Sequence, residues 1–301
     1  MSARDKTPKH AAVKVDLHCH SHCSDGKHSI DFLAQQASDN GVTHLAITDH
    51  DYVHTAFATS TTQGVTLING VEISCDWHNL ELHVVGLLVD PACDALQNLL
   101  VSQQSKRRER MTAMDGLLTE RGIPGLMQSL GELPAVSLSR SHVADFLVTT
   151  GASNTRQKAF KQFLGKKGKV AVAPDWCSMH SAIEAIHAAG GIAILAHPGR
   201  YPVNRRRLTL LVEEFKTSGG DALECAYPNI AVDMQQALVT LARDHQLYLS
   251  AGSDFHDAGA KWTDIGKFPS ISVNDEALAV WHHPRWISEF GHAVGMSAQA
   301  V

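Results

Sequence analysis

Short apolar runs alternate with longer amphipathic segments along most of the chain. Short runs rich in aliphatic residues are typical of buried strands, whereas polar–apolar repeats of helical period predict helices. The apolar runs predict strands at 13–17, 44–48, 65–68, 81–89, 192–196, 222–225 and 247–250. The repeats predict helices at 29–40, 53–63, 178–189, 205–217 and 231–245, with 70–79 separating two strands. Ser29 and Gly41 are suited to cap the first of these helices. The alternation predicts an α/β fold built on a mostly parallel sheet or a barrel.

The region from about residue 93 to 169 breaks this rhythm, because it contains no strand-like run. Helical patterns at 95–121 and 139–150 are followed there by a stretch rich in Lys and Arg at 156–169. We therefore predict an inserted helical domain. The predicted parts of the chain are a flexible tail at 1–12, a barrel at 13–95 and 170–290, and the insert at 96–169. The basic stretch is interpreted as a solvated face, with an electrostatic track for RNA as the alternative.

Composition narrows the class of protein. The chain has 301 residues, of which 44% are hydrophobic and 19% charged, so it can bury a sizeable core. No apolar run approaches the roughly 18 residues that cross a membrane, and the polar N-terminus lacks the apolar core of a signal peptide. We expect a cytoplasmic protein with its six Cys as reduced thiols. The net charge of -5 argues against broad binding to nucleic-acid duplexes.

The 19 His residues are unusually many beside 26 Lys and Arg, and several of them follow predicted strands. The candidate ligands at or near strand ends are His18, His20, His50, Glu72, His197, Asp254 and His256, and His83 begins a returning strand. In βα barrels the carboxyl ends of strands open onto one shared face. His18 and His20 are two residues apart, so on a strand they can chelate one ion. Mixed imidazole and carboxylate ligands favour Mn, Fe or Zn over Mg alone.

These segments form an ordered set of motifs. They are DLHCHSHCSDG at 16–26, LAITDHD at 45–51, NGVEIS at 69–74, ELHVVGL at 81–87, AILAHPGRY at 193–201 and AGSDFH at 251–256. With this set the chain resembles the PHP (polymerase and histidinol phosphatase) superfamily. More narrowly, it is similar to the bacterial 3′,5′-nucleoside bisphosphate phosphatases, a group that includes 5′→3′ exoribonucleases. The similarity extends over about residues 13–265, and the departures, such as Cys19 and Cys75, do not fall on a candidate ligand.

The resemblance implies a distorted (β/α)7 barrel with a small inserted helical domain, and a centre of three divalent ions. The ligand sets it implies are His18, His20, Glu72 and Asp254 for one ion, Glu72, His83 and His197 for a second, and Asp25, His50 and His256 for a third. Mn²⁺ is the expected metal, with Fe²⁺, Zn²⁺ or Mg²⁺ as alternatives. A water held by the metals, and no protein side chain, is the expected nucleophile. Asp49 and Asp51 are expected to hydrogen-bond to ligands and not to bind metal directly.

The implied reaction is hydrolysis of the 3′-phosphate of nucleoside bisphosphates such as pAp, or removal of nucleotides 5′→3′ from short 5′-phosphorylated RNA or DNA, as in ribosomal RNA 5′-end maturation. The residues expected to hold substrate phosphate are Arg107, Arg110, Arg140, His142 and Arg200. The alternative interpretations are a solvated helix face for Arg107 and Arg110, capping or packing for Arg140 and His142, and simple exposure for Arg200. Trp77 and Trp176 are expected to pack, with base stacking as the alternative.

Other functions remain open from the residues alone. They are a histidinol-phosphatase-like enzyme, an amidohydrolase, which also opens with H-x-H but needs a bridging carboxylated Lys, and a noncatalytic metal-binding module. The expected partners are a small nucleotide and short RNA or DNA 5′ ends, with no membrane and no obligate protein partner. The oligomeric state is not predicted.

Overall fold

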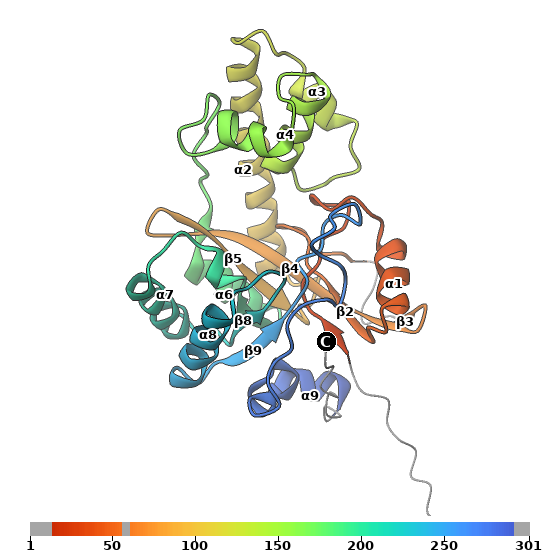
Figure 1. Ribbon diagram of the computed structural model, residues 1–301, viewed down its shortest axis with the longest axis vertical. Coiled ribbons are helices and arrows are strands. Elements are labelled where there is room, and N and C mark those ends of the chain that lie inside the picture. Colours follow the sequence, from red (N-terminus) through yellow and green to blue (C-terminus); the bar gives the residue numbers. More distant parts are fainter. Residues whose placement is uncertain (1–13, 56–60, 292–301) are drawn as a thin grey trace, which may run out of the picture.

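The computed structural model describes residues 14–55 and 61–291. Within these residues one nine-stranded sheet forms the centre of the protein (Figure 1). Its strands are β1 (Val15–Asp16), β2 (His44–Ile47), β3 (Thr61–Thr62), β4 (Val65–Trp77), β5 (Leu80–Leu87), β6 (Cys177–Ser178), β7 (Ile192–Leu195), β8 (Ala222–Ala226) and β9 (Tyr248–Ala251). The main path through the sheet is β1-β2-β4-β5-β7-β8-β9, while β3 and β6 pair with β4.

The two edges of this path meet through the segments that follow β1 and β9. The Leu17 amide donates to the Ala251 carbonyl at 3.1 Å, the Asp254 amide to His18 at 2.8 Å, and the His20 amide to Phe255 at 2.9 Å. The sheet is therefore a nearly closed barrel, and the predicted α/β barrel is confirmed. Along the main path the strand pairs are parallel except around β5, which is antiparallel to both β4 and β7. Off this path, β3 is antiparallel to β4 and β6 is parallel to it.

The barrel is surrounded by helices that bury one apolar face each. Among the described residues these helices are α1 (Ile30–Asp39), α6 (Met179–Ala188), α7 (Arg205–Thr217), α8 (Val232–Asp244) and α9 (Pro284–Phe290), with short 3₁₀ turns η2 (Pro198–Arg200), η3 (Glu276–Leu278) and η4 (Val280–His282). In α1 the Ser29 hydroxyl caps the N-terminus by accepting from the Phe32 amide, and Gly41 follows the helix at φ +70°, as predicted.

Two predictions along the first half of the barrel are wrong. The helix predicted at 53–63 is absent from the described part of that range, where 61–62 form β3; residues 56–60 lie outside the described residues. The predicted break at 70–79 is also absent, because β4 continues to Trp77 and only His78 and Asn79 turn. Gly70 serves close packing and not a turn, since a Cβ there would lie 2.7 Å from the Thr48 methyl.

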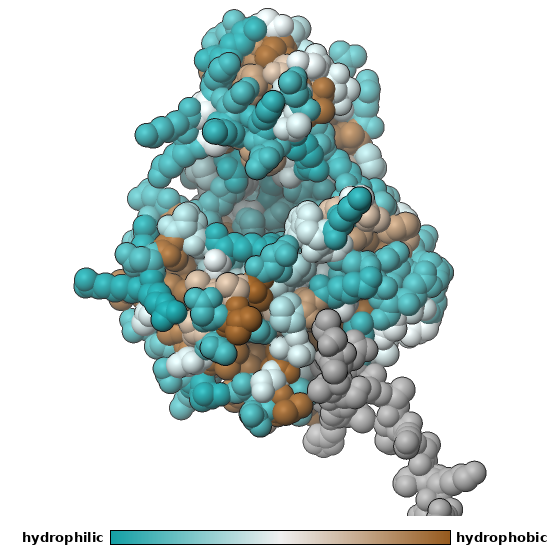
Figure 2. Space-filling model, in the orientation of Figure 1, coloured by the Kyte–Doolittle hydropathy of each residue, from teal (hydrophilic) through white to brown (hydrophobic). Residues whose placement is uncertain are grey.

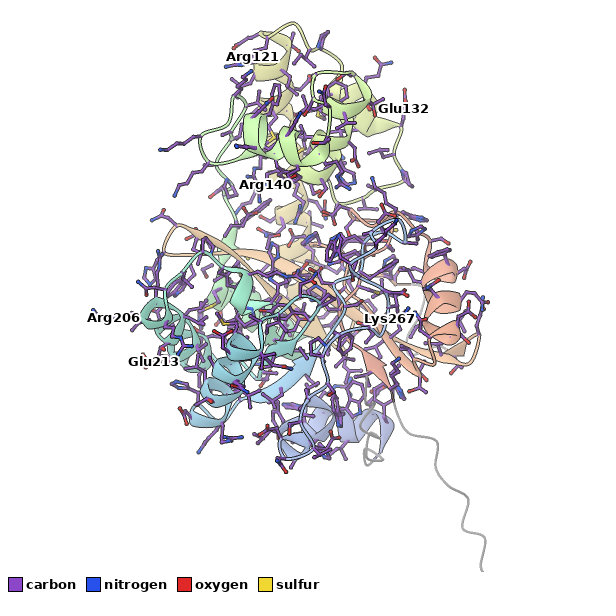
Figure 3. The ribbon with its side chains drawn as sticks, viewed as in Figure 1. Arg121, Glu132, Arg140, Arg206, Glu213 and Lys267 are labelled. Carbon is purple, nitrogen blue, oxygen red and sulfur yellow. The ribbon has the colours of Figure 1, made fainter. Side chains whose placement is uncertain are left out.

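A helical region stands on the barrel and contains α2 (Asp94–Thr119), α3 (Leu126–Gly131), α4 (Arg140–Thr149), α5 (Arg156–Ala159) and the π-helical turn η1 (Phe160–Leu164). It has an apolar cluster of its own, which includes Met111, Met114, Val143 and Leu147. Figure 3 shows Arg140 on the side of this region that faces the barrel. The boundaries 96–169 of an independent domain stay a prediction.

Two further properties concern the whole described chain. Its helices include none with both the length and the apolar character needed to cross a bilayer. The six cysteines are free thiols.

Figure 2 shows that the face between the helical region and the barrel is hollowed and hydrophilic, in contrast to the apolar interior of each part. This hollow leads to the residues that carry the candidate chemistry.

Candidate metal centre

Glu72 lies at the centre of a cluster of imidazoles. Its side chain is 1% exposed. The sequence pattern predicts that Glu72 follows the end of a strand, but the residue lies within β4. Its carboxylate oxygens lie within contact of five His side chains. The distances are 3.3 Å to His18 Nε2, 3.3 Å to His20 Nε2, 3.0 Å to His50 Nδ1, 3.0 Å to His83 Nδ1 and 3.0 Å to His197 Nε2. One carboxylate therefore touches five imidazoles from four segments of the chain.

The predicted ligands gather into overlapping groups whose ligand atoms lie within 4.8 Å of one another. The groups are His18, His20 and Asp254; His18, Glu72 and His197; His50, Glu72 and His83; and His20, Asp25, His50 and His256. All of the predicted ligands are in at least one group. The grouping differs in part from the implied sets, because His50 joins Glu72 as well as Asp25.

Local backbone geometry aims several of these side chains inward. His197 and Asp254 have φ of 30° and 49°, in the left-handed region that residues other than glycine rarely adopt. Both follow the ends of strands, β7 and β9. Asp51, after β2, has φ of 46°. Strained residues of this kind concentrate at functional sites, where the surrounding structure holds them in place.

The cluster concentrates charge in a buried volume. Burial would raise the pKa of the Glu72 carboxyl, but the imidazoles of His83, His50 and His18 hold it well below its ordinary value. Burial would lower the pKa of His20, but hydrogen bonds to Asp254 and Glu72 raise it to about 10. These carboxylates therefore favour a proton on the His20 imidazole. A cation could take the place of that proton.

Unpaired polar atoms indicate the same ligand. Among the described residues, His197 Nδ1 is buried without a hydrogen-bond partner. Asp25 Oδ1, His50 Nδ1 and His83 Nδ1 are buried and form no well-aligned hydrogen bond, although each lies 3.0–3.3 Å from an ion-pair partner. Buried polar atoms normally have such partners, since losing them costs about 1–3 kcal/mol each. Oxygen and imidazole nitrogen are the donor atoms that Mn, Fe and Zn ions accept. The residues therefore fit a centre that binds divalent metal ions.

Sequence reasoning missed Glu224, which supports this centre from β8. One of its oxygens lies 3.0 Å from His18 Nδ1, and the other accepts from the His197 amide at 2.6 Å. Carboxylates in this position orient metal-binding imidazoles and fix which ring nitrogen carries the proton. The signal was present in the chain, because Glu224 is a charged residue inside the apolar run Ala222–Ala226.

Three further carboxylates hold the loops around the centre. Asp49 accepts hydrogen bonds from Ser21 and Ser24 in the segment that carries His20 and Asp25. Asp16 accepts from the amides of Ser253 at 2.8 Å and Gly266 at 2.7 Å, and burial raises its pKa to about 6. Asp51 contacts Arg107 and accepts from the Ser74 amide at 2.9 Å.

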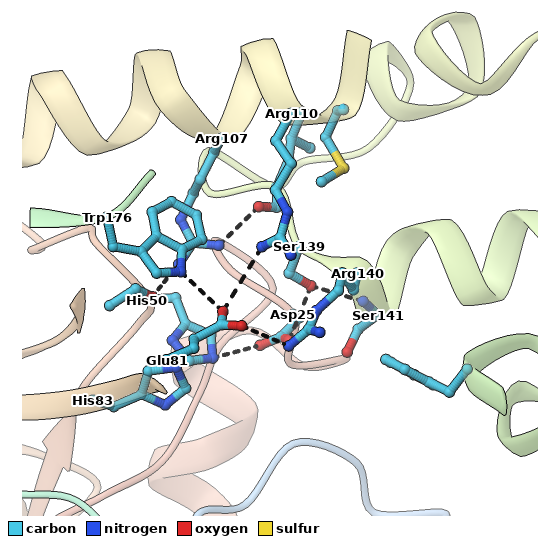
Figure 4. A pocket seen from close by; sticks show the side chains of 14 residues that line it. Asp25, His50, Glu81, His83, Arg107, Arg110, Ser139, Arg140, Ser141 and Trp176 are labelled. Carbon is cyan, nitrogen blue, oxygen red and sulfur yellow. Dashed lines mark hydrogen bonds and ion pairs between the residues drawn. The ribbon is translucent and has the colours of Figure 1, made fainter. Parts of the chain in front are cut away.

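A hollow of about 110 Å³ lies between the cluster and the helical region. Figure 4 shows Arg107 and Arg110 entering it from α2, opposite Asp25, His50 and His83 of the barrel side. Glu81, which sequence reasoning also missed, occupies the middle of this group. The Glu81 carboxylate lies 3.1 Å from an Arg140 nitrogen and 3.8 Å from an Arg110 nitrogen, and accepts from Trp176 Nε1 at 3.0 Å.

The predicted phosphate-binding residues differ in how free they are. Arg107 is 4% exposed, and its guanidinium donates to Asp51, to the Leu138 carbonyl and to Ser74 Oγ at 2.7–2.9 Å. His142 accepts from the Ser139 amide at 3.0 Å and completes the cap of α4, so its capping interpretation has a structural basis. Arg110 and Arg140 line the hollow as well (Figure 4). Arg110 is also buried, and its Nε donates to the Val172 carbonyl at 3.0 Å, whereas Arg140 is only partly buried.

Arg200 lies on another side of the centre, on η2. Its guanidinium bonds to the Asp254 carboxylate and stands 5.0 Å from the ring centroid of Tyr227. Arg200 thus touches a predicted ligand directly, and it lines a second groove that runs away from the cluster. Trp77 and Trp176 both pack against charged groups, since each indole N–H donates to a glutamate.

Comparison with known proteins places these features in a wider context. The family model described as the PHP domain matches residues 16–111. A 5′-3′ exoribonuclease of Haemophilus influenzae is 37% identical, over 89% of this chain and 98% of that protein. A 3′,5′-nucleoside bisphosphate phosphatase of Chromobacterium violaceum is 36% identical, over 84% of this chain and 91% of that protein. A solved structure from Chromobacterium violaceum, described as an amidohydrolase with bound sulfate and no metal, has a TM-score of 0.81 and 33% identity, over 90% of this chain and 95% of that chain.

Proposed function

This chain belongs to the PHP family of phosphoester hydrolases, and from that premise we propose that its centre acts on nucleotides carrying a 5′-phosphate. The proposed reactions are hydrolysis of the 3′-phosphate of 3′,5′-nucleoside bisphosphates such as pAp and 5′→3′ removal of nucleotides from short RNA or DNA. The observation that carries this proposal is the direct contact between the Glu72 cluster and an arginine-lined hollow. His50, His83 and Asp25 line both.

We assign the metal ligands as the resemblance implies. They are His18, His20, Glu72 and Asp254; Glu72, His83 and His197; and Asp25, His50 and His256. Divalent ions held by these residues, with Mn²⁺ as the preferred ion, would supply Lewis acidity that lowers the pKa of water and neutralises charge on phosphoryl oxygens. Glu72 bridges two of the sets, and its contacts with five imidazoles support that role.

Arg110 and Arg140 are proposed to bind the 5′-phosphate. Both guanidinium groups face Glu81, which keeps them in the hollow in the free protein. A phosphate carries more negative charge than one carboxylate and offers oxygens that match the guanidinium fork, so it can compete for these donors. Arg107 has its donors occupied by the protein, so its proposed role is to hold Asp51 and the adjacent His50 in place.

The same arrangement accounts for two kinds of substrate. A 5′-phosphate bound at Arg140 would leave the next phosphate of the nucleotide near Glu72. That next phosphate is a terminal monoester in pAp and a diester in RNA. The 5′-phosphate thus sets the register in both cases, and the proposal includes RNA 5′ ends, such as those of ribosomal RNA, among the partners. Such substrates also fit the predicted cytoplasmic location.

Three alternatives lead to different experiments. The similar Chromobacterium violaceum structure is described as an amidohydrolase, but in this chain the Glu72 carboxylate is shared by two of the candidate metal groups and so holds the bridging place that a carboxylated Lys would take. A noncatalytic metal-binding module has no need of the arginine-lined hollow. A histidinol-phosphatase-like enzyme needs no second phosphate site. We therefore favour the bisphosphate and RNA-end activity over these three.

A substrate panel with added Mn²⁺ tests the proposal. We expect phosphate release from pAp but little from 3′-AMP, which lacks the 5′-phosphate, and cleavage of a 5′-phosphorylated RNA pentamer but not of its 5′-hydroxyl form. Arg140→Ala should lower kcat/KM for pAp by about 10- to 150-fold, because a charge-assisted contact contributes roughly 1.5–3 kcal/mol. Arg121→Ala, on the far end of the helical region (Figure 3), is the matched control. Equal rates with and without a 5′-phosphate, or preference for histidinol phosphate or a lactone, would refute the proposal.

A further inference from the structure

Trp262 is an exposed residue that directly precedes a buried one. Its side chain and backbone are 59% exposed, on the loop that follows β9. The next residue, Thr263, is buried, and its hydroxyl donates to the Ser253 carbonyl at 3.2 Å. Ser253 directly precedes Asp254, a predicted metal ligand. The backbone next to the exposed indole is therefore tied to the segment that carries Asp254.

A groove of about 610 Å³ is lined by this indole and by Arg200, which contacts the candidate ligand Asp254. Arg200 and Tyr227 line one part of it, Met234 and Ile230 its apolar wall, and Trp262 another part. Arg200 also bonds to Asp254, so one part of the groove lies next to the cluster. Its volume lies in the range of pockets that bind drug-sized molecules. The groove thus offers a cation next to the centre and an aromatic face farther away.

The groove and the arginine-lined hollow are lined by different residues in or next to the centre. The hollow touches Asp25, His50 and His83, whereas the groove touches Arg200, the partner of Asp254. A substrate with one phosphate over the centre can therefore extend in both directions. Under the proposed function the hollow holds the 5′-terminal nucleotide, which leaves the groove for the chain on the other side of the scissile bond.

We propose that this groove binds the single-stranded RNA that lies 3′ of the scissile bond, with the indole of Trp262 stacking on one base and Arg200 contacting the backbone. Proteins bind single strands by this combination of aromatic platforms and cations, and stacking tolerates any base because every base has a π face. The inference rests on the proposed function. It explains how one centre serves both pAp, which ends at the scissile phosphate, and RNA, which continues beyond it.

The charges around the groove set the path of the strand. Asp233 lines the α8 side of the groove and repels phosphate there. Lys261 is exposed beside Trp262 and lines a neighbouring hollow, in which Lys267 pairs with Asp264 at 2.6 Å. One cation, Arg200, therefore lines the groove, and another, Lys261, lies next to Trp262 in the sequence. Backbone phosphates are expected to follow those two residues.

Kinetics on two substrates test the inference. Trp262→Ala should lower kcat/KM for a 5′-phosphorylated RNA pentamer by about 5- to 150-fold, the range expected for loss of one stacked base, and leave kcat/KM for pAp within about twofold. Trp262→Phe should restore most of the pentamer activity, because a phenyl ring still stacks. Val101→Ala is the control, since Val101 is an apolar residue, 67% exposed, on α2.

Each other outcome has a distinct meaning. An unchanged pentamer rate in Trp262→Ala would overturn the inference. A matching loss on pAp would also overturn it, because the effect would then lie at the centre itself. Failure of the wild-type protein to cleave either substrate would instead refute the proposed function. Thermal unfolding of each variant shows whether a loss of activity reflects a loss of fold.

Discussion

Replacing Glu224 by Gln tests whether a carboxylate that hydrogen-bonds to predicted metal ligands also controls the affinity for metal. The change keeps the size and shape of the side chain and removes its charge. In the wild-type protein one oxygen faces His18 Nδ1 at 3.0 Å and the other accepts from the His197 amide at 2.6 Å. With His18 Nε2 turned toward Glu72, Nδ1 carries the ring proton when His18 is a neutral ligand. Both oxygens of Glu224 therefore accept from N–H groups.

The magnitude follows from the number of acceptors. Gln has one carbonyl oxygen, so either the His18 ring N–H or the His197 amide must face the NH₂ group of the side chain. The variant loses one buried hydrogen bond to a charged acceptor, at a cost of about 1.5–3 kcal/mol. This cost corresponds to roughly a 10- to 150-fold weaker affinity for metal, since each 1.4 kcal/mol is tenfold. The range agrees with the effect of other residues that orient metal-binding imidazoles, about 10- to 100-fold.

Metal affinity is best measured by titrating metal-free protein with Mn²⁺ in competition with a chelator, together with phosphate release from pAp. The matched control is Glu213→Gln, the same change on the exposed side of α7 (Figure 3). We expect weaker binding for Glu224→Gln and none of this loss for the control, with urea unfolding of both variants to monitor the fold. Affinity within about twofold of wild type, or an equal loss in Glu213→Gln, would refute the reasoning.

Two further predictions concern buried charges. Arg107→Met should lower the free energy of unfolding in urea by about 3–5 kcal/mol, because it leaves the buried Asp51 carboxylate without its cation. The control Arg108→Met, at an exposed position, should change it by less than about 0.5 kcal/mol. Similar effects for both would contradict the role assigned to Arg107. Metal affinity should rise with pH between about pH 6 and 9. Asp254 and Glu72 raise the pKa of His20 to about 10, so His20 must lose a proton before it can bind a metal ion. Calorimetry in two buffers of different ionisation enthalpy measures this proton release, and binding without proton release would contradict the prediction.

Local sequence signals were sufficient for most helices and strands. The predicted helix at 205–217 coincides with α7, and Ser29 caps α1 as expected, because capping and apolar periodicity involve residues within one or two turns. The same signals failed at 53–63 and 70–79. There the chain pairs across the sheet, with Thr61 opposite Thr66 and Asp76 opposite Glu81, and such pairing contributes more than local propensity.

The sequence by itself determined the kinds of groups at the candidate site and their approach to one face of a barrel. Strand ends followed by His, Asp and Glu predict that much, because βα units share one catalytic face. It did not determine which group lies at the centre. Glu72 holds that place because β4 continues past its neighbours and pairs with the returning β5, which brings His83 to it.

Tertiary structure also decided the roles of the surrounding residues. Arg107 has the same residue type as Arg110 and lies one helical turn away, yet it is bound to Asp51 while Arg110 faces the hollow. Glu224 and Trp262 acquire their proposed roles only through residues distant in the chain, His18 for one and Arg200 for the other. The physical reason is range. Secondary structure depends on contacts between residues a few positions apart, whereas the role of a side chain depends on the residues it contacts. When the barrel closes, it brings together segments more than 200 residues apart, such as those of His18 and Glu224.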